Sequence, residues 1–166
     1  SPLKTRIYYT ISPASLWFTK QLPLEKWVEL ISYIPGDATV YLLGSSSDHE
    51  QCDEIISKAV HPETKNLAGK LTFLQSAALM KDARMNFTND SAPMHLASSL
   101  NAPVTVIYCS TVPQFGFGPL SENSCVVEIA EKLSCRPCGL HGYQSCPEKH
   151  FRCAFDIDTK KFLDRL

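Results

Sequence analysis

The sequence lacks the features that mark several large classes of protein. None of its apolar runs approaches the roughly 20 residues that a helix needs to cross a bilayer, and no signal-peptide pattern opens it. Its formal net charge of −1 leaves no overall field to attract nucleic acid or an anionic membrane. Neither a G-x-G-x-x-G nor a Walker motif occurs, which argues against a dinucleotide-dependent dehydrogenase and a P-loop enzyme. An initial Met is also missing, and we interpret the Ser1-Pro2 start as a cut from a longer protein, although a processed terminus would look the same.

The remaining composition is that of an ordinary globular domain, with 44% hydrophobic and 20% charged residues in a chain of 166. Short segments rich in β-branched and aromatic residues are expected to be strands: residues 6–11, 39–43, 85–88, 104–108 and 125–129. Between them, helical spacing predicts helices. Since strands alternate with helices, we expect one doubly wound α/β domain over residues 1–166, with a mostly parallel sheet covered on both faces.

The predicted helices have recognisable starts and apolar stripes. Pro23 is expected as the first residue of a helix whose stripe contains Trp27, Leu30, Ile31 and Ile34. Later helices are expected to begin near Asp48, Thr72, Asp90 and Asp158. In the helix that Thr72 caps, the core candidates are Leu74, Ala77, Ala78 and Met80.

One predicted strand-to-helix turn could bind an anion. Asp90 and Ser91 precede a helix whose first amides have no partner within it, and together with the helix dipole these amides suit a diphosphate. Ser91 could add a hydroxyl donor, and His95 falls one turn into the helix. The alternative is that Asp90 or Ser91 merely caps the helix and that His95 is an ordinary helix residue.

Two further loops could contact the same ligand. Lys20 stands just before a helix, where its charge could meet phosphate, although a lone loop lysine is usually only solvated. Asp48 and Glu50 follow a buried strand and could accept hydrogen bonds from a ribose or base. Alternatively, these two acidic residues only stabilise the dipole of their own helix.

Seven cysteines are present, and four of them fall in one polar loop. Cys135-x-x-Cys138 has the spacing favoured by structural zinc, and Cys146 and Cys153 could complete a four-thiolate site. The other reading is a metal-free loop of partly buried thiols. The spare ligands near this loop are His141 and His150, and the expected buried thiols elsewhere are Cys52, Cys109 and Cys125.

Taken together, several motifs resemble the C-terminal half of the ADP-heptose:lipopolysaccharide heptosyltransferases, glycosyltransferase family 9. The most specific is Asp90-Ser91-Ala92-Pro93-Met94-His95. The supporting motifs, in the family's order, are Thr19-Lys20-x-x-Pro23, Tyr41-Leu42-Leu43-Gly44 with Asp48-x-Glu50, Asn66-Leu67-Ala68-Gly69-Lys70, Gly118-Pro119 and Cys135-Arg136-Pro137-Cys138.

The resemblance implies one Rossmann-like half of a GT-B glycosyltransferase. The N-terminal half, absent from this chain, would hold the lipid-linked saccharide acceptor and the general base, so no catalytic base is expected here. The resemblance also implies that sugar transfer needs neither a metal ion nor a cofactor. The enzyme is expected in the cytoplasm, either free or peripherally bound at the cytoplasmic face of the inner membrane. The implied site residues are Ser15, Lys20, Ser91, Ala92, Met94 and His95 for the donor phosphates, Asp48 or Glu50 for the nucleoside, and Asp90 to shape the turn.

One departure from the family pattern concerns Ala92, where glycine is usual. A methyl group there would crowd the closest backbone approach to phosphate. Because the family is not known to bind zinc, we favour the metal-free reading of the cysteine loop, with a structural role. The alternatives to a heptosyltransferase are a GT-B relative or epimerase that uses another nucleotide sugar, and a non-catalytic nucleotide-sugar-binding module.

Overall fold

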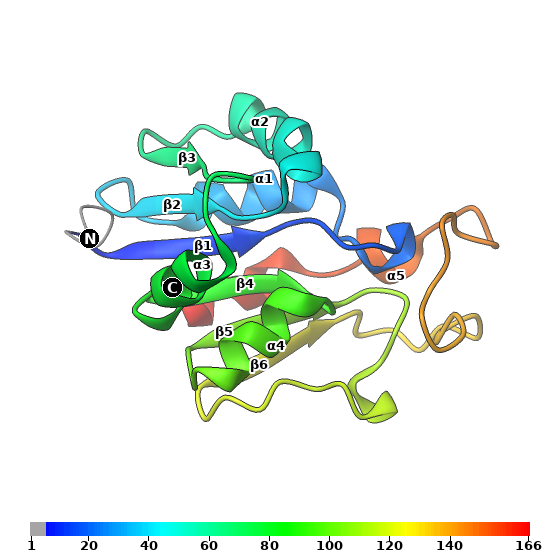
Figure 1. Cartoon of the computed structure of the whole chain (residues 1–166). Coiled ribbons are helices and arrows are strands. Elements are labelled where there is room, and N and C mark those ends of the chain that lie inside the picture. Colours follow the sequence, from blue (N-terminus) through cyan, green and yellow to red (C-terminus); the bar gives the residue numbers. More distant parts are fainter. Residues whose placement is uncertain (1–5) are drawn as a thin grey trace.

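A six-stranded, fully parallel sheet organises the chain, in the order β3-β2-β1-β4-β5-β6 (Figure 1). The computed structural model describes residues 6–166. The strands are β1 (Tyr8–Ser12), β2 (Thr39–Leu42), β3 (Thr64–Asn66), β4 (Met85–Asn89), β5 (Val104–Tyr108) and β6 (Ser124–Glu128). This order is that of a doubly wound nucleotide-binding sheet, and it confirms the predicted fold class.

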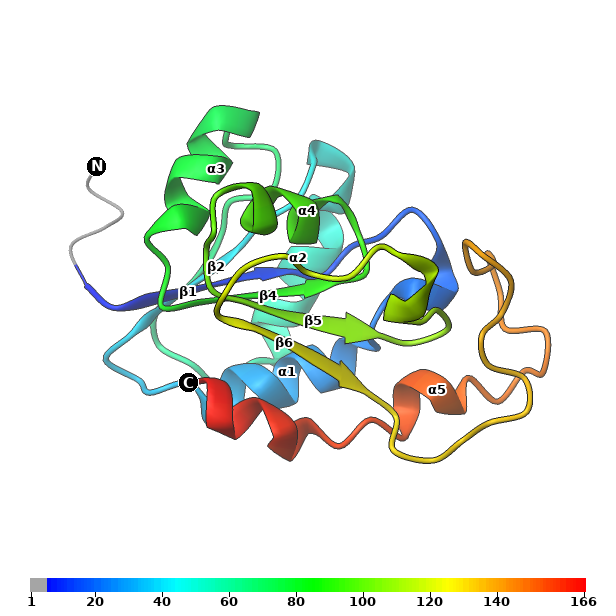
Figure 2. The ribbon, with the colours of Figure 1, turned by 90° about the horizontal axis from the view of Figure 1, so that it is seen from below.

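Helices cover both faces of the sheet, as Figure 2 shows. The α-helices are α1 (Leu24–Tyr33), α2 (His49–Lys58), α3 (Phe73–Lys81), α4 (Ala92–Ser99) and α5 (Arg152–Phe155). Shorter 3-10 turns are η2 (Phe18–Lys20), η3 (Ser46–Asp48), η4 (Pro113–Phe115) and η5 (Thr159–Arg165). The two faces carry separate hydrophobic clusters, one under α1, α2 and η5 and the other under α3 and α4.

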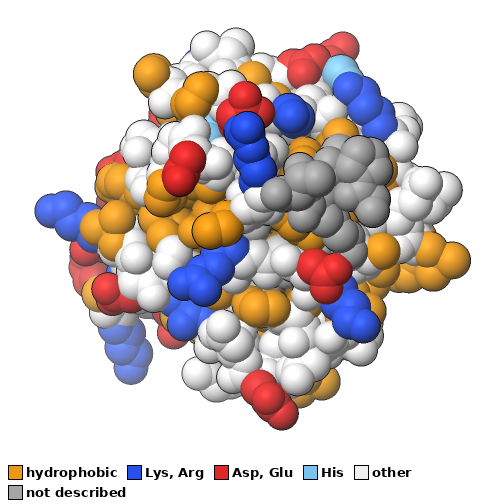
Figure 3. Space-filling model, turned by 90° about the vertical axis from the view of Figure 1, so that its left-hand side faces the viewer, with side chains coloured by type: hydrophobic (Ala, Val, Ile, Leu, Met, Phe, Trp, Pro, Cys, Tyr) orange, Lys and Arg blue, Asp and Glu red, His pale blue; other side chains and the backbone are white. Residues whose placement is uncertain are grey.

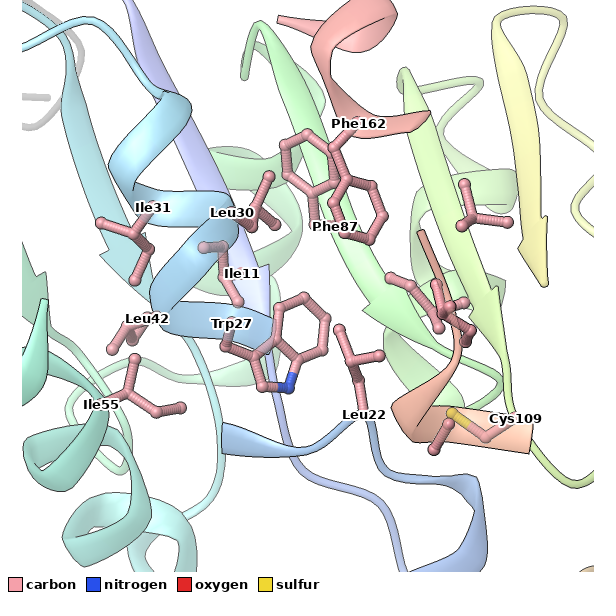
Figure 4. Packing of buried hydrophobic residues seen from close by; sticks show 14 of the residues in the cluster. Ile11, Leu22, Trp27, Leu30, Ile31, Leu42, Ile55, Phe87, Cys109 and Phe162 are labelled. Carbon is pink, nitrogen blue, oxygen red and sulfur yellow. The ribbon is translucent and has the colours of Figure 1, made fainter. Parts of the chain in front are cut away.

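The larger cluster is centred on α1 (Figure 4). Trp27, Leu30 and Ile31 are fully buried against β1 and β2. Phe87 of β4 contacts the ring of Phe162 from η5 edge-on, with centroids 5.8 Å apart. The predicted stripe of α1 is therefore confirmed, and the C-terminal turn closes the same core.

Several local predictions need correction. Pro23 is the N-cap of α1 instead of its first residue. Thr72 caps α3 as predicted, but Leu74 is 76% exposed and Ala78 is also exposed, while Leu79 is buried in their place. The predicted strand over residues 6–11 begins two residues later, at Tyr8, and the last predicted helix is the 3-10 turn η5. Asp158 caps this turn by accepting from the Lys160 amide.

On the side of the sheet where the strands begin, there is an open cavity of about 870 Å³. Figure 3 looks onto this side, where cationic and anionic side chains are mixed. The cavity is lined by Arg6, Ile7, Tyr8, Tyr9, Pro35, Asp37, Ala38, Asp82, Arg84 and Leu166. Parallel sheets of this type bind ligands at the opposite edge, so this cavity does not mark the expected site. Over residues 6–166, no helix has the length and apolar character needed to span a membrane.

Candidate functional site

The loops after β1 and β4 meet at the carboxyl edge of the sheet, the side at which all its parallel strands end. β1 pairs with β4, and the crossovers run in opposite directions from these two strands, which makes this the topological switch point. Lys20 from the first loop and Asp90 from the second form an ion pair of 2.8 Å, with side chains only 17% and 7% exposed. Two predicted site residues, 70 positions apart, are thus in direct contact.

Asp90 has a larger role than the turn-shaping one expected for it. Its Oδ2 accepts from both Lys20 Nζ and the Thr111 hydroxyl, which lies 2.7 Å away in the loop after β5. Its backbone amide donates to the Ile107 carbonyl. Asp90 therefore connects the ends of β1, β4 and β5.

Asn89, for which the sequence suggested no role in the site, fixes the loop that carries Lys20. Its side-chain oxygen accepts from the Leu22 amide at 3.0 Å, and its side-chain nitrogen donates to the Pro13 carbonyl at 2.7 Å. Both ends of the loop are thereby held by one fully buried amide. A buried polar residue at the last position of a strand is the signal that could have identified it.

The start of α4 leaves one backbone hydrogen-bond donor available to a ligand. Ser91 is the N-cap, but its hydroxyl caps no amide and instead donates a long hydrogen bond of 3.4 Å to the Asn89 carbonyl. Ala92 is the first helical residue, so its amide has no acceptor within the helix. The Met94 amide donates to the Ser91 carbonyl at 3.0 Å, and the Met94 side chain is buried. Of the two amides expected to bind phosphate, only that of Ala92 is unengaged.

His95 lies on the exposed side of α4 and faces the loop after β5. Its ring meets that of Phe117 edge-on, with centroids 6.4 Å apart. The Tyr108 hydroxyl donates to the Phe117 carbonyl at 2.7 Å, which anchors this loop to the sheet. His95 therefore lies one turn into α4, as predicted, and its side chain is exposed.

The loop after β2 holds the candidates for nucleoside binding. Asp48 Oδ2 accepts from the Ser45 amide and the Ser45 hydroxyl, both at 2.7 Å, so Asp48 acts as a helix-capping residue. Glu50 is exposed in the first turn of α2. Asp48 is thus engaged at the start of its helix, where the alternative prediction placed its role, and Glu50 is the more available acceptor.

Ser15 lies in the same loop as Lys20 and is half-buried. Its carbonyl accepts from the Gln21 side chain at 2.8 Å. Deeper in the edge, Ser12 and Thr88 are neighbours across β1 and β4. Among the described residues, their hydroxyls are buried without a hydrogen-bond partner. This edge therefore has polar groups that the protein itself leaves unsatisfied.

The cysteine loop folds back over the carboxyl edge (orange in Figure 1) instead of lying apart from it. The Thr19 amide donates to the Tyr143 carbonyl at 3.0 Å. All seven thiols are free, and among residues 6–166 no group of three or more His, Cys, Asp or Glu side chains is arranged to hold a metal ion. Burial, reinforced by the neighbouring Cys138, Cys146 and Cys135, raises the pKa of Cys153 from 9.0 to about 12.

Comparison with known proteins relates this chain to a family. Residues 2–144 match the sequence profile of glycosyltransferase family 9 (heptosyltransferase). Lipopolysaccharide heptosyltransferase 2 of Escherichia coli K12 is 33% identical over 161 residues, which are 93% of this chain and 42% of that protein. The enzyme of the same name from Salmonella typhimurium LT2 is 32% identical over 122 residues, 70% of this chain and 33% of that protein.

The solved structure of E. coli ADP-heptose lipopolysaccharide heptosyltransferase II is also similar. It has a TM-score of 0.78 at 27% identity, and the match covers 96% of this chain and 45% of that one. The chain thus spans less than half the length of these relatives.

Proposed function

We propose that this chain, which belongs to glycosyltransferase family 9, is the donor-binding half of an enzyme that transfers heptose from an ADP-heptose-like nucleotide sugar to the lipopolysaccharide inner core. The observation that carries the proposal is the Lys20–Asp90 pair, placed one residue before the N-cap of α4 at the switch point of the sheet. A cation and a helix N-terminus at one place form a site for a diphosphate.

The residues at this edge suit the stabilisation of a departing diphosphate. When the bond between sugar and phosphate breaks, negative charge grows on the phosphate oxygens. Lys20 supplies a positive charge, and the Ala92 amide and the Ser91 hydroxyl supply donors. His95 and Ser15 lie on the same helix and loop as these groups and would contact the same ligand. These charges and donors could support transfer without a metal ion.

The nucleoside would extend toward the loop after β2, which lies beside β1 in the sheet. The carboxylate of Glu50, exposed in the first turn of α2, could accept a hydrogen bond from a ribose hydroxyl. One Asp48 carboxylate oxygen is already engaged by Ser45, so its contribution would be indirect, through the shape of this loop.

The acceptor and the general base belong to the remainder of the enzyme. We propose that a second domain holds the lipid-linked saccharide and the carboxylate base, and that the whole protein works at the cytoplasmic face of the inner membrane. A sugar transferred to a lipid-linked acceptor requires both halves of the cleft, because half a cleft leaves the donor exposed to water.

The donor is tested by NMR titration of this chain with ADP, GDP and UDP sugars. We expect ADP sugars to bind most tightly, and Lys20→Ala to weaken them while Lys81→Ala does not. Lys81 is a suitable control because it is an exposed lysine at the end of α3, at the opposite edge of the sheet. Tighter binding of a GDP or UDP sugar would instead indicate a GT-B relative or an epimerase.

Transfer is tested with the whole protein and with this chain alone, using an inner-core acceptor. We expect activity from the whole protein, also in the presence of EDTA, and none from the chain. Nucleotide-sugar binding without transfer by the whole protein would indicate a non-catalytic binding module. Loss of activity in EDTA that returns with a divalent ion would contradict metal-independent transfer.

A further inference from the structure

The hydroxyl, amide and carbonyl groups of Thr19, the residue before Lys20, all form hydrogen bonds within the protein. Its hydroxyl oxygen accepts from the Tyr143 amide at 2.7 Å and from the Ser110 hydroxyl at 3.0 Å. Its amide donates to the Tyr143 carbonyl at 3.0 Å, and its carbonyl accepts from the Ser110 amide at 3.2 Å. With only 1% of its surface exposed, Thr19 is fixed between the loop after β5 and the cysteine loop.

Gly142, next to Tyr143 in the cysteine loop, leaves no room for a side chain beside Thr19. Gly142 has a φ of +76°, and a Cβ there would lie 2.7 Å from Thr19 Oγ1, 3.0 Å from Ser110 Oγ and 3.4 Å from Lys20 Cγ. Only glycine fits, because any side chain would push Thr19 and the Lys20 stem away.

Arg136 anchors the other end of the same loop. Its Nε donates to the Cys109 carbonyl at 2.7 Å, and Nη2 donates to the Thr111 carbonyl at 2.8 Å and pairs with Glu128 at 2.6 Å. The Cys138 amide donates to the Ser110 carbonyl at 2.8 Å. The segment of residues 109–111 that receives these bonds also carries Thr111, which binds Asp90.

We infer that four residues of the cysteine loop, Arg136, Cys138, Gly142 and Tyr143, form a positioning element that sets Lys20 for the donor diphosphate, acting through Thr19. This inference rests on the proposed function for the identity of the ligand. Lys20 and Asp90 contact one another directly, and both are held by segments that the loop binds. A shift of the loop would therefore move the cation relative to α4 without removing any group that touches the ligand.

The test compares Gly142→Ala with Gly139→Ala in NMR titrations with ADP and with adenosine. Gly139 lies in the same loop at a φ of +65°, but its Cβ would meet only the far end of the Tyr143 side chain, 3.2 Å from the hydroxyl oxygen and 3.6 Å from Cζ. Both variants therefore carry a similar backbone strain. We expect Gly142→Ala to weaken ADP binding about tenfold and to leave adenosine binding unchanged, with Gly139→Ala close to the parent chain. Equal weakening of ADP and adenosine, or unchanged ADP affinity in a folded Gly142→Ala chain, would overturn the inference.

Two further measurements separate this inference from the proposed function. Thr19→Ser should retain ADP affinity and Thr19→Val should lose it, because only serine keeps the accepting hydroxyl.

If the parent chain binds no ADP, the proposed function fails, and the positioning role is then judged by melting temperature alone. Asp90→Asn should lower the melting temperature less in the Gly142→Ala chain than in the parent, because the pair is already displaced. Equal decreases in both backgrounds would refute the positioning role.

Discussion

Replacing Lys20 by Met should destabilise the fold more than replacing Asp90 by Asn. The two charges are 2.8 Å apart and are mostly removed from water. At an effective dielectric constant of 20, their attraction is about 6 kcal/mol, most of which offsets the desolvation of both groups. Lys20→Met leaves the 7% exposed carboxylate of Asp90 with Thr111 as its remaining side-chain partner.

The two substitutions are unequal because their remaining partners differ. We expect Lys20→Met to lower the free energy of unfolding by about 3 kcal/mol, in the range for an uncompensated buried charge. Asp90→Asn should cost about 1–2 kcal/mol, because the amide oxygen can still accept from Thr111 and the lysine is the more exposed partner. The double variant should show a coupling energy of about 1–3 kcal/mol.

Urea unfolding at pH 7 measures these energies, provided that the slopes with denaturant agree among the variants. Lys81→Met serves as the control for replacing a lysine, since Lys81 is exposed at the end of α3. A cost for Lys20→Met no larger than that of the control, or additive effects of the two substitutions, would show that the pair is not energetically coupled.

Three other predictions concern separate parts of the molecule. His95→Ala should weaken ADP-sugar binding by about 1–3 kcal/mol and leave urea unfolding unchanged, because His95 is exposed; equal calorimetric affinity in the folded variant would remove His95 from the site. Phe87→Ala should lower the unfolding free energy by about 3–5 kcal/mol, since its fully buried ring packs against Phe162 and Tyr9; a cost below 1 kcal/mol would contradict the described packing. Burial raises the pKa of Cys52 from 9.0 to about 12, so the stability it contributes is complete below pH 9 and is lost as the pH rises toward 12; Cys52→Ala should flatten that alkaline decline, and an equally steep decline would reject the assignment.

The strands could be predicted because their signal is local. The segment Val104–Tyr108 was predicted with its observed bounds, since five consecutive buried residues of a central strand read as an apolar run. The prediction for α3 was less accurate because Leu74 and Ala78 are apolar yet face outward. Helical spacing alone cannot distinguish the two sides of a short helix when both carry apolar residues.

The individual site residues could also be predicted, but not their contacts. The sequence placed Lys20 and Asp90 in two loops after strands, and the rule that ligands bind at carboxyl ends made both candidates. It did not show that β1 and β4 are neighbours, which depends on the strand order of the whole sheet. No role was predicted for Thr19, Asn89 or Arg136 for the same reason, since their roles consist of bonds to distant backbone groups.

The Lys20–Asp90 pair also constrains how a diphosphate could enter the site. A lysine held next to a carboxylate is already oriented toward the start of α4, so little side-chain entropy remains to be lost on binding. The same carboxylate repels an incoming phosphate and competes for the ammonium group. A bound phosphate must therefore either displace Asp90 from Lys20 or contact Lys20 alongside it. Thr111 favours the second arrangement, because its hydroxyl bond keeps Asp90 in place. The donors on the other side, the Ala92 amide and the Ser91 hydroxyl, have no competing anion of this kind. We therefore expect phosphate to occupy the helix side of Lys20, with Asp90 remaining bound behind it.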